Sequence, residues 1–375
     1  PYEDHQLLIR DLKTTSEYLS SFESENRIPF SEFYYMSDFL PRLNIENYYL
    51  DVEQFFQIKS NALQIRDITK FFAEFEEYFP ELQKIVSKTI YENEIVKEID
   101  TVFNKHGEIK NSASNELAEI RKKIKNVTVK IADLFKKAIA QNSEYLDDIK
   151  ETVVDNKRVL AVNSGMRKRV KGRLLGTSKT GSISFIEPQN VYQSNRELEE
   201  LIDEEAKEVI KILRNLTAVI AVHKETLETY EDLLEYLDFT QAKARFSQKI
   251  NAVLPHIKPQ KKLNLIDAYH PILYLKNSEK KLKTIPQTLS INDKQRIIII
   301  SGPNAGGKSI TLKTIGLNQL MIQSGILIPV HPTSEIGFFN KIFTDIGDNQ
   351  SIENQLSTYS YRLKQMNYFL KKCNK

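Results

Sequence analysis

Apolar positions recur at helical spacing through much of the chain, and changes in this pattern divide its 375 residues into three segments. In residues 1–110 the spacing predicts a helical core of short helices that end near Pro29, Pro41 and Pro80. Aromatic residues cluster here, as in FFAEFEEYF at 71–79. Because they recur at helical spacing, we interpret them as core residues rather than as platforms for stacking nucleobases.

Two long helices with matching apolar faces are predicted within residues 111–255. Ser and Asn in SASNE at 112–116 provide caps for the first helix. Between the helices, at about 151–187, short β-prone runs and four glycines predict a small sheet. The stripes favour an antiparallel coiled coil, with a globular bundle as the alternative. The apolar stripe of the first helix consists of Leu117, Ile120, Ile124, Val127, Ile131, Leu134 and Ala138. The stripe of the second helix consists of Leu198, Ile202, Ala206, Val209, Leu213, Leu216 and Ile220.

Residues 256–375 change to strand-like runs interrupted by a helical pattern. The sequences LNLIDAYHPILYL, IPQTLSI and RIIIISG predict strands, and ILIPV and KIFTDIG predict two more. SITLKTIGLNQLMIQSG predicts a helix between them. This alternation is typical of an α/β domain with a largely parallel sheet.

Charge is distributed unevenly, although the net charge of +3 is too small to indicate a nucleic-acid partner by itself. Residues 157–179 contain eight Lys or Arg and no Asp or Glu. Such a segment predicts salt-sensitive contact with the phosphates of DNA or RNA. A solvated basic hairpin, balanced by the acidic residues of 197–208, is the alternative. The candidate contact residues are Lys157, Arg158, Arg167, Lys168, Arg169, Lys171 and Arg173.

Composition excludes several other classes of protein. The apolar run at 297–300, like every other apolar run in the chain, is far too short to cross a membrane. A single cysteine, Cys373, excludes an internal disulfide framework, and with no signal segment at the start it predicts a cytoplasmic protein. The histidines show no metal-ligand spacing, so no zinc site is expected.

Residues 302–309 carry the strongest chemical signal. GPNAGGKS matches the phosphate-loop pattern G-x-x-x-x-G-K-[ST] in full, between a predicted strand and a predicted helix. The glycines allow backbone N–H groups to turn toward phosphate oxygens, and the helix N-terminus adds positive charge. Lys308 would contact the β and γ phosphates and stabilise transition-state charge, and Ser309 would bind Mg²⁺. The predicted ligands are therefore ATP or ADP with Mg²⁺, held by Gly302, Pro303, Asn304, Ala305, Gly306, Gly307, Lys308 and Ser309.

The loop, with LKTIG after it, resembles the MutS family of ABC-type ATPases. Three more stretches resemble the branch that lacks the mismatch-reading domain and whose full-length members usually end in an Smr nuclease domain. They are SGMRKRVKGRLLGTSKTGSISFIEPQNVYQSNRELEEL (164–201), AYHPIL (268–273) and FTDIGDNQSIENQLSTYS (343–360). The resemblance implies an α + α/β fold with a helical core, a long antiparallel coiled-coil lever arm and an incomplete P-loop ATPase domain.

Roles for further residues follow from the same resemblance. His270 would lie near the adenine or ribose, Gln350 would sense metal and water, and Ser357 would face the γ-phosphate bound to a partner subunit. The implied activity is ATP hydrolysis coupled to clamping of branched or mismatched DNA by a homodimer, with possible endonuclease activity in the full-length protein. The alternatives are a ribosome- or RNA-associated quality-control ATPase of this branch and a non-catalytic, nucleotide-sensing scaffold.

Two departures from the family pattern bear on activity. The turn Thr284-Ile285-Pro286-Gln287 lacks a stacking aromatic at the place where the family packs an aromatic or aliphatic residue on adenine, which predicts modest affinity for the base. No apolar strand ending in Asp-Glu follows Ser360, so the groups that hold Mg²⁺ and activate water are missing. The chain also starts with Pro and stops within a predicted helix. We therefore expect a catalytically incomplete fragment of a longer protein.

Overall fold

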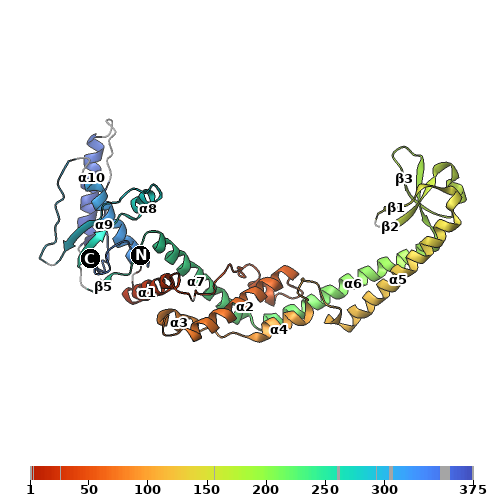
Figure 1. Cartoon of the computed structure of the whole chain (residues 1–375), viewed down its shortest axis with the longest axis horizontal. Helices are drawn as coiled ribbons and strands as arrows, with labels where there is room; N and C mark the ends of the chain where they lie inside the picture. The colour runs from red at the N-terminus through yellow and green to blue at the C-terminus, as the bar shows by residue number, and fades with distance from the viewer. Residues whose placement is uncertain are drawn as a thin grey trace. The chain divides into compact units, whose positions relative to one another are not determined.

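The fold is mixed α + β and divides into two compact units (Figure 1). The computed structural model describes residues 2, 4–25, 27–155, 157–259, 262–292, 294–303, 307–346 and 355–373, with the side chains of 355–362 left out. Residues 34–62 and 92–228 form one unit, here called the helix-pair unit. Residues 1–33, 63–91 and 229–375 form the other, here called the loop unit because it contains residues 302–309.

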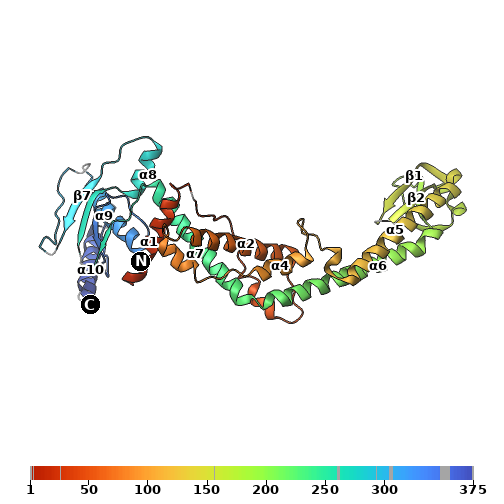
Figure 2. The ribbon, with the colours of Figure 1, turned by 60° about the horizontal axis from the view of Figure 1, so that its bottom comes forward.

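Two long helices, α5 (Asn115–Gln141) and α6 (Gln189–Ala221), lie side by side in the helix-pair unit (Figures 1 and 2). Ser114 caps α5 by accepting a hydrogen bond from the Leu117 N–H at 3.0 Å. The helices are antiparallel, because later positions of α5 meet earlier positions of α6. The contacts that show this are Ser114 Oγ to Glu208 at 2.9 Å, Arg121 to Glu205 at 2.7 Å and Asn190 to the Leu134 carbonyl at 3.2 Å.

The interface between α5 and α6 departs from the predicted apolar stripe on α6. Ile202 is 50% exposed, and its neighbour Leu201 is buried instead. Glu205 and Glu208 lie on the side of α6 that contacts α5, so a polar section interrupts the stripe. On α5 the predicted positions Leu117, Val127, Ile131 and Ala138 are buried, and so is Phe135, which the heptad pattern left out.

A four-stranded antiparallel sheet joins α5 to α6. Its strands lie in the order β1-β2-β4-β3 and are β1 (Leu146–Val154), β2 (Lys157–Asn163), β3 (Gly172–Thr177) and β4 (Ile183–Pro188). Leu160, Val162 and Ile186 pack from the sheet against Phe135 and Val191 of the helices. At Gly172 the strands come so close that a Cβ would lie 2.2 Å from the Glu187 carbonyl oxygen. The sheet is therefore fixed to the ends of both helices that meet it.

A shorter helix of the same unit, α4 (Asn93–Val102), packs against α6.

The loop unit combines helices with a second four-stranded sheet, in the order β5-β8-β6-β7. The helices are α1 (His5–Ser21), α3 (Pro80–Val86), α8 (Pro271–Glu279), α9 (Lys308–Gln323), α10 (Gln355–Cys373) and most of α7 (Lys224–Lys249), and α2 (Val52–Glu74) runs through both units. The strands are β5 (His256–Lys258), β6 (Leu263–Ala268), β7 (Gln287–Ile291) and β8 (Glu335–Gly337). Only β5 and β8 are parallel, whereas β6 is antiparallel to both β7 and β8. The prediction of a largely parallel sheet is wrong for the strands described.

Residues 296–302 (RIIIISG), predicted to form the strand before the phosphate loop, adopt no regular secondary structure. Ile297 is 82% exposed and Ile299 is 88% exposed. β-branched residues favour a strand only when neighbours pair with its backbone and cover its faces. None of the strands described pairs with this run, which explains the difference. Residues 341–346 likewise form no strand, and ILIPV contributes only an isolated bridge from Ile328 to Val253.

The core of the loop unit brings α1 against the end of α9. Leu8 and Leu12 of α1 pack in one cluster with Met321 and Ile322 of α9 and with strand β6. Beside them, Lys243 of α7 donates to Asp11 of α1, and both side chains are almost fully buried. Gly325, just after α9, has φ +73°, and a Cβ there would lie 1.8 Å from Asp11 Oδ2. The end of α9 therefore rests directly on Asp11.

Gly325→Ala is expected to destabilise the loop unit. Placing a Cβ on a residue in the left-handed conformation lowers the free energy of unfolding by about 1–2 kcal/mol, and the Asp11 carboxylate must also shift. Gly316→Ala is the matched control, because Gly316 lies inside α9 and a Cβ there meets nothing within 4 Å. Gly316→Ala should raise the free energy of unfolding of the loop unit by about 0.5–1 kcal/mol. Chemical denaturation checks both, and equal effects at the two sites would contradict the structure.

Candidate functional site

The phosphate-loop sequence lies at the start of α9. Gly307 is the residue that precedes the helix and has φ +83°, and Gly302 has φ +146°. Both conformations favour glycine. A Cβ at either position would meet no atom of the described residues within 4 Å, so they leave the space beside the loop backbone open. The N-terminus of α9 is thus exposed to a ligand, which is the arrangement that phosphate binding requires.

Lys308 is oriented by the loop itself. Its Nζ donates to the carbonyl of Gly302 and, at 2.9 Å, to the carbonyl of Pro303. Carbonyl oxygens carry only partial charge, so a phosphate oxygen is a stronger acceptor for this ammonium group. Ser309 follows in the first turn and is exposed. The ammonium group of Lys308 therefore lies beside the loop, together with the Ser309 hydroxyl, which makes no hydrogen bond to any other described residue.

Thr311 ties the loop to the neighbouring sheet, a contact that the sequence pattern did not identify. Its hydroxyl donates to Gln287 Oε1 on β7 at 3.0 Å and contacts the Gly307 carbonyl at 3.2 Å. Gln287 belongs to the turn beside which the family resemblance places a residue that packs on adenine. The sequence signals only the contact with Gly307, because Thr in a first helical turn commonly bonds backwards to a carbonyl.

His270 lies at a helix start rather than on the predicted strand. It precedes α8, and its Nδ1 accepts the Leu273 N–H at 3.3 Å. Burial lowers the pKa of His270, and the positive charge of Lys313 on α9 lowers it further. Asn318 of α9 also donates to the Tyr269 carbonyl at 3.1 Å. His270 is therefore placed beside the middle of α9, and it is biased toward the neutral imidazole.

Several predicted residues cannot be placed at the site. Asn304, Ala305, Gly306 and Gln350 lie outside the described residues. Ser357 lies on α10, but its side chain is not described. The described part of the predicted nucleotide site therefore consists of Gly302, Pro303, Gly307, Lys308, Ser309 and His270, to which the structure adds Thr311 and Gln287.

The described loop residues fit a nucleotide phosphate and a magnesium ion. Open space beside two glycine backbones, a helix N-terminus and an ammonium group suit phosphate oxygens. The Ser309 hydroxyl is of the kind that ligates Mg²⁺ in phosphate loops. Among the described residues no group of three His, Cys, Asp or Glu side chains could hold a metal by itself.

The basic segment of the helix-pair unit separates into neutralised and unpaired cations. Lys157 pairs with Glu199 at 2.7 Å, and Arg158 pairs with Glu151 at 2.5 Å. The bond with Glu199 raises the pKa of Lys157. The other five candidates make no ion pair with any described carboxylate, and all are exposed: Arg167, Lys168, Arg169, Lys171 and Arg173. They follow one another through a 3₁₀ turn (Ser164–Arg169) and into β3.

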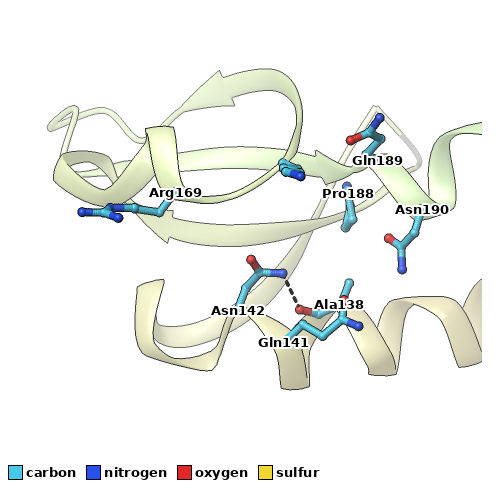
Figure 3. A pocket seen from close by; sticks show the side chains of 8 residues that line it. Ala138, Gln141, Asn142, Arg169, Pro188, Gln189 and Asn190 are labelled. Carbon is cyan, nitrogen blue, oxygen red and sulfur yellow. Dashed lines mark hydrogen bonds between the residues drawn. The ribbon is translucent and has the colours of Figure 1, made fainter.

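A pocket of about 460 Å³ opens beside these cations, where α5 ends and α6 begins. Figure 3 shows Gln141 and Asn142 at the end of α5, with Gln189 and Asn190 across from them at the start of α6. Arg169 and Lys171 also line it, and none of its lining residues is acidic. Sequence analysis missed the four carboxamides, because their proximity depends on how the sheet returns the chain from α5 to α6.

Comparison with known proteins places these features in one family. The profile for MutS domain V matches residues 298–375, which include the phosphate loop. The protein of Finegoldia magna named Endonuclease MutS2 is 34% identical over 319 residues, covering 84% of this chain and 40% of the relative. The protein of the same name in Aquifex aeolicus is 32% identical over 381 residues, covering 100% of this chain and 48% of the relative.

The chain spans about half the length of the curated relatives that it matches. No helix in the described part of the chain is long and apolar enough to cross a membrane. The matches extend over the helices, the small sheet and the loop alike, as the protein of Clostridium botulinum named Endonuclease MutS2 shows with 30% identity over 97% of this chain. The chain belongs to the MutS family, in its MutS2-type branch.

Proposed function

We propose that the chain binds ATP through its loop unit and DNA through its helix-pair unit, as part of a MutS-family ATPase. The observation that carries this proposal is the phosphate loop at the start of α9, within the match to MutS domain V. To residues 302–309 we assign the binding of ATP and not its hydrolysis. ATP hydrolysis, and the endonuclease activity in the names of the relatives, belong to our proposal for the intact protein.

The nucleotide would bind with its phosphates on the N-terminus of α9. The Lys308 Nζ would exchange its hydrogen bonds to the carbonyls of Gly302 and Pro303 for bonds to the β and γ phosphates. Ser309 would ligate Mg²⁺. Neutral His270 supports a place near the adenine or ribose, because a neutral imidazole accepts as well as donates hydrogen bonds. In the intact protein we propose that two copies associate, with Ser357 of one facing the γ-phosphate held by the other.

DNA would bind the unpaired cations of the small sheet. Five exposed Lys and Arg side chains between 167 and 173 lack carboxylate partners among the described residues, so they are free to contact phosphates. We propose three working segments: a helical core at 1–110, a coiled-coil lever arm at 111–255 and the front of an ATPase domain at 256–375. The antiparallel packing of α5 and α6 supports the arm, whose sheet would clamp branched or mismatched DNA.

Lys308→Ala tests the nucleotide half of the proposal. Loss of a hydrogen-bonded ammonium group should raise the Kd for a fluorescent ATP analogue with Mg²⁺ by about 10- to 100-fold. Lys280→Ala is the matched control, because Lys280 is an exposed lysine of the same unit just after α8. The control should bind as tightly as the parent chain. An unchanged Kd in Lys308→Ala, with circular dichroism unchanged, would refute the assignment.

A further inference from the structure

The pocket between α5 and α6 offers a mixture of groups that a plain anion site would not need. Arg169 and Lys171 bring positive charge. Asn142 and Asn190 each donate one Nδ2 hydrogen, to the Ala138 carbonyl at 2.8 Å and the Leu134 carbonyl at 3.2 Å, which leaves each amide one N–H and its oxygen. The pocket therefore offers hydrogen-bond acceptors as well as donors, whereas a ligand that carries only negative charge needs donors alone.

The remaining carboxamides are uncommitted. The side chains of Gln141 and Gln189 are exposed and make no hydrogen bond within the part of the chain that the structure describes. Each has a donor and an acceptor at its end, which is the pairing that a nucleobase edge presents. A ligand that satisfies the whole pocket therefore carries both an anionic group and an edge with donors and acceptors. A nucleotide has both.

The dimensions of the pocket favour one nucleotide over a stretch of duplex. Its volume of about 460 Å³ lies in the range of small-molecule sites. In a duplex the Watson–Crick edge of each base is occupied by its partner and is buried in the stack. Only a base without a partner can present that edge to the side chains of a pocket.

We propose that this pocket takes one unpaired nucleotide of a DNA strand, with its phosphate on Arg169 and Lys171 and its base edge on Gln141 and Gln189. The inference rests on the proposed function, because the neighbouring cations must first hold the DNA backbone. It goes beyond backbone contact in giving the helix-pair unit a preference for DNA that contains single-stranded nucleotides. The cations supply affinity, and the carboxamides supply the preference.

The test compares two fluorescein-labelled DNAs by anisotropy, a plain duplex and the same duplex with a short single-stranded arm. The 375-residue chain should bind the armed duplex about tenfold more tightly, since two carboxamide hydrogen bonds to a base contribute about threefold each. The double variant Gln141→Ala/Gln189→Ala should lose this preference while its affinity for plain duplex stays within about twofold. Gln193→Ala is the matched control, because Gln193 is exposed on α6 and does not line the pocket.

The outcomes separate this inference from the function on which it rests. Equal affinity of the parent chain for both DNAs overturns the inference and leaves DNA binding intact. A preference that survives in the double variant also overturns it, because the carboxamides would not then be its source. Failure of the parent chain to bind either DNA refutes the proposed DNA binding, and the inference with it.

Discussion

Replacing the five unpaired cations with glutamine is expected to weaken DNA binding about 10³-fold at about 0.15 M salt. The residues are Arg167, Lys168, Arg169, Lys171 and Arg173, and none has a carboxylate partner among the described residues. Each phosphate contact contributes about 0.9 to the slope of log K against log salt, so the slope should fall by up to about 4.5. A salt titration of duplex binding measures both quantities.

The matched control uses the two neutralised cations of the same segment. Lys157 and Arg158 already pair with Glu199 and Glu151, so Lys157→Gln/Arg158→Gln should change the salt slope by less than one phosphate contact, about 0.9. The sequence alone placed all seven cations in one group. Equal losses in the two variants would show that the ion pairs do not determine which cations contact DNA.

Asp11→Asn is expected to destabilise the loop unit by about 3–5 kcal/mol, because it leaves the buried ammonium group of Lys243 without its carboxylate. The side chains of Asp11 and Lys243 are 7% and 5% exposed, so water cannot replace the lost partner. Lys243→Met should cost a similar amount for the converse reason. The double variant should cost less than the sum of the two, because neither charge then remains buried alone. Guanidinium unfolding with all three variants measures these differences.

An exposed ion pair of the same unit provides the control. Lys84 contacts Glu81 at 3.0 Å, but its side chain is 68% exposed. Lys84→Met should therefore change the free energy of unfolding by less than about 1 kcal/mol. If Asp11→Asn proved as mild as Lys84→Met, the pair with Lys243 would not be buried in solution.

Local signals in the sequence predicted the parts of the fold that depend on short stretches of chain. The cap at Ser114, the long helix that follows it and the turn at Gly307 each need only a few neighbouring residues, and the structure contains all three. Pro271 starts a helix where the sequence pattern predicted a strand. Proline is favoured in the first turn of a helix, so AYHPIL begins α8 at Pro271 instead of continuing β6.

Features that depend on distant partners were not predictable in the same way. Ile297 and Ile299 have strong strand preference, yet no described strand pairs with them. Leu201 replaces Ile202 in the α6 interface because Glu205 and Glu208 turn toward α5, which periodicity alone does not reveal. The carboxamide pocket has the same origin, because its two sides come from opposite ends of the sheet that joins α5 to α6. Only the folded chain brings them together.

The central claim is that nucleotide and DNA bind to separate units of this chain. The most direct measurement is a pair of titrations, of the fluorescent ATP analogue and of labelled DNA, each carried out on Lys308→Ala and on the variant without the five cations. We expect that Lys308→Ala loses binding of the nucleotide only and that the five-cation variant loses binding of DNA only. Loss of both ligands in either variant, or of neither ligand in both, would contradict it.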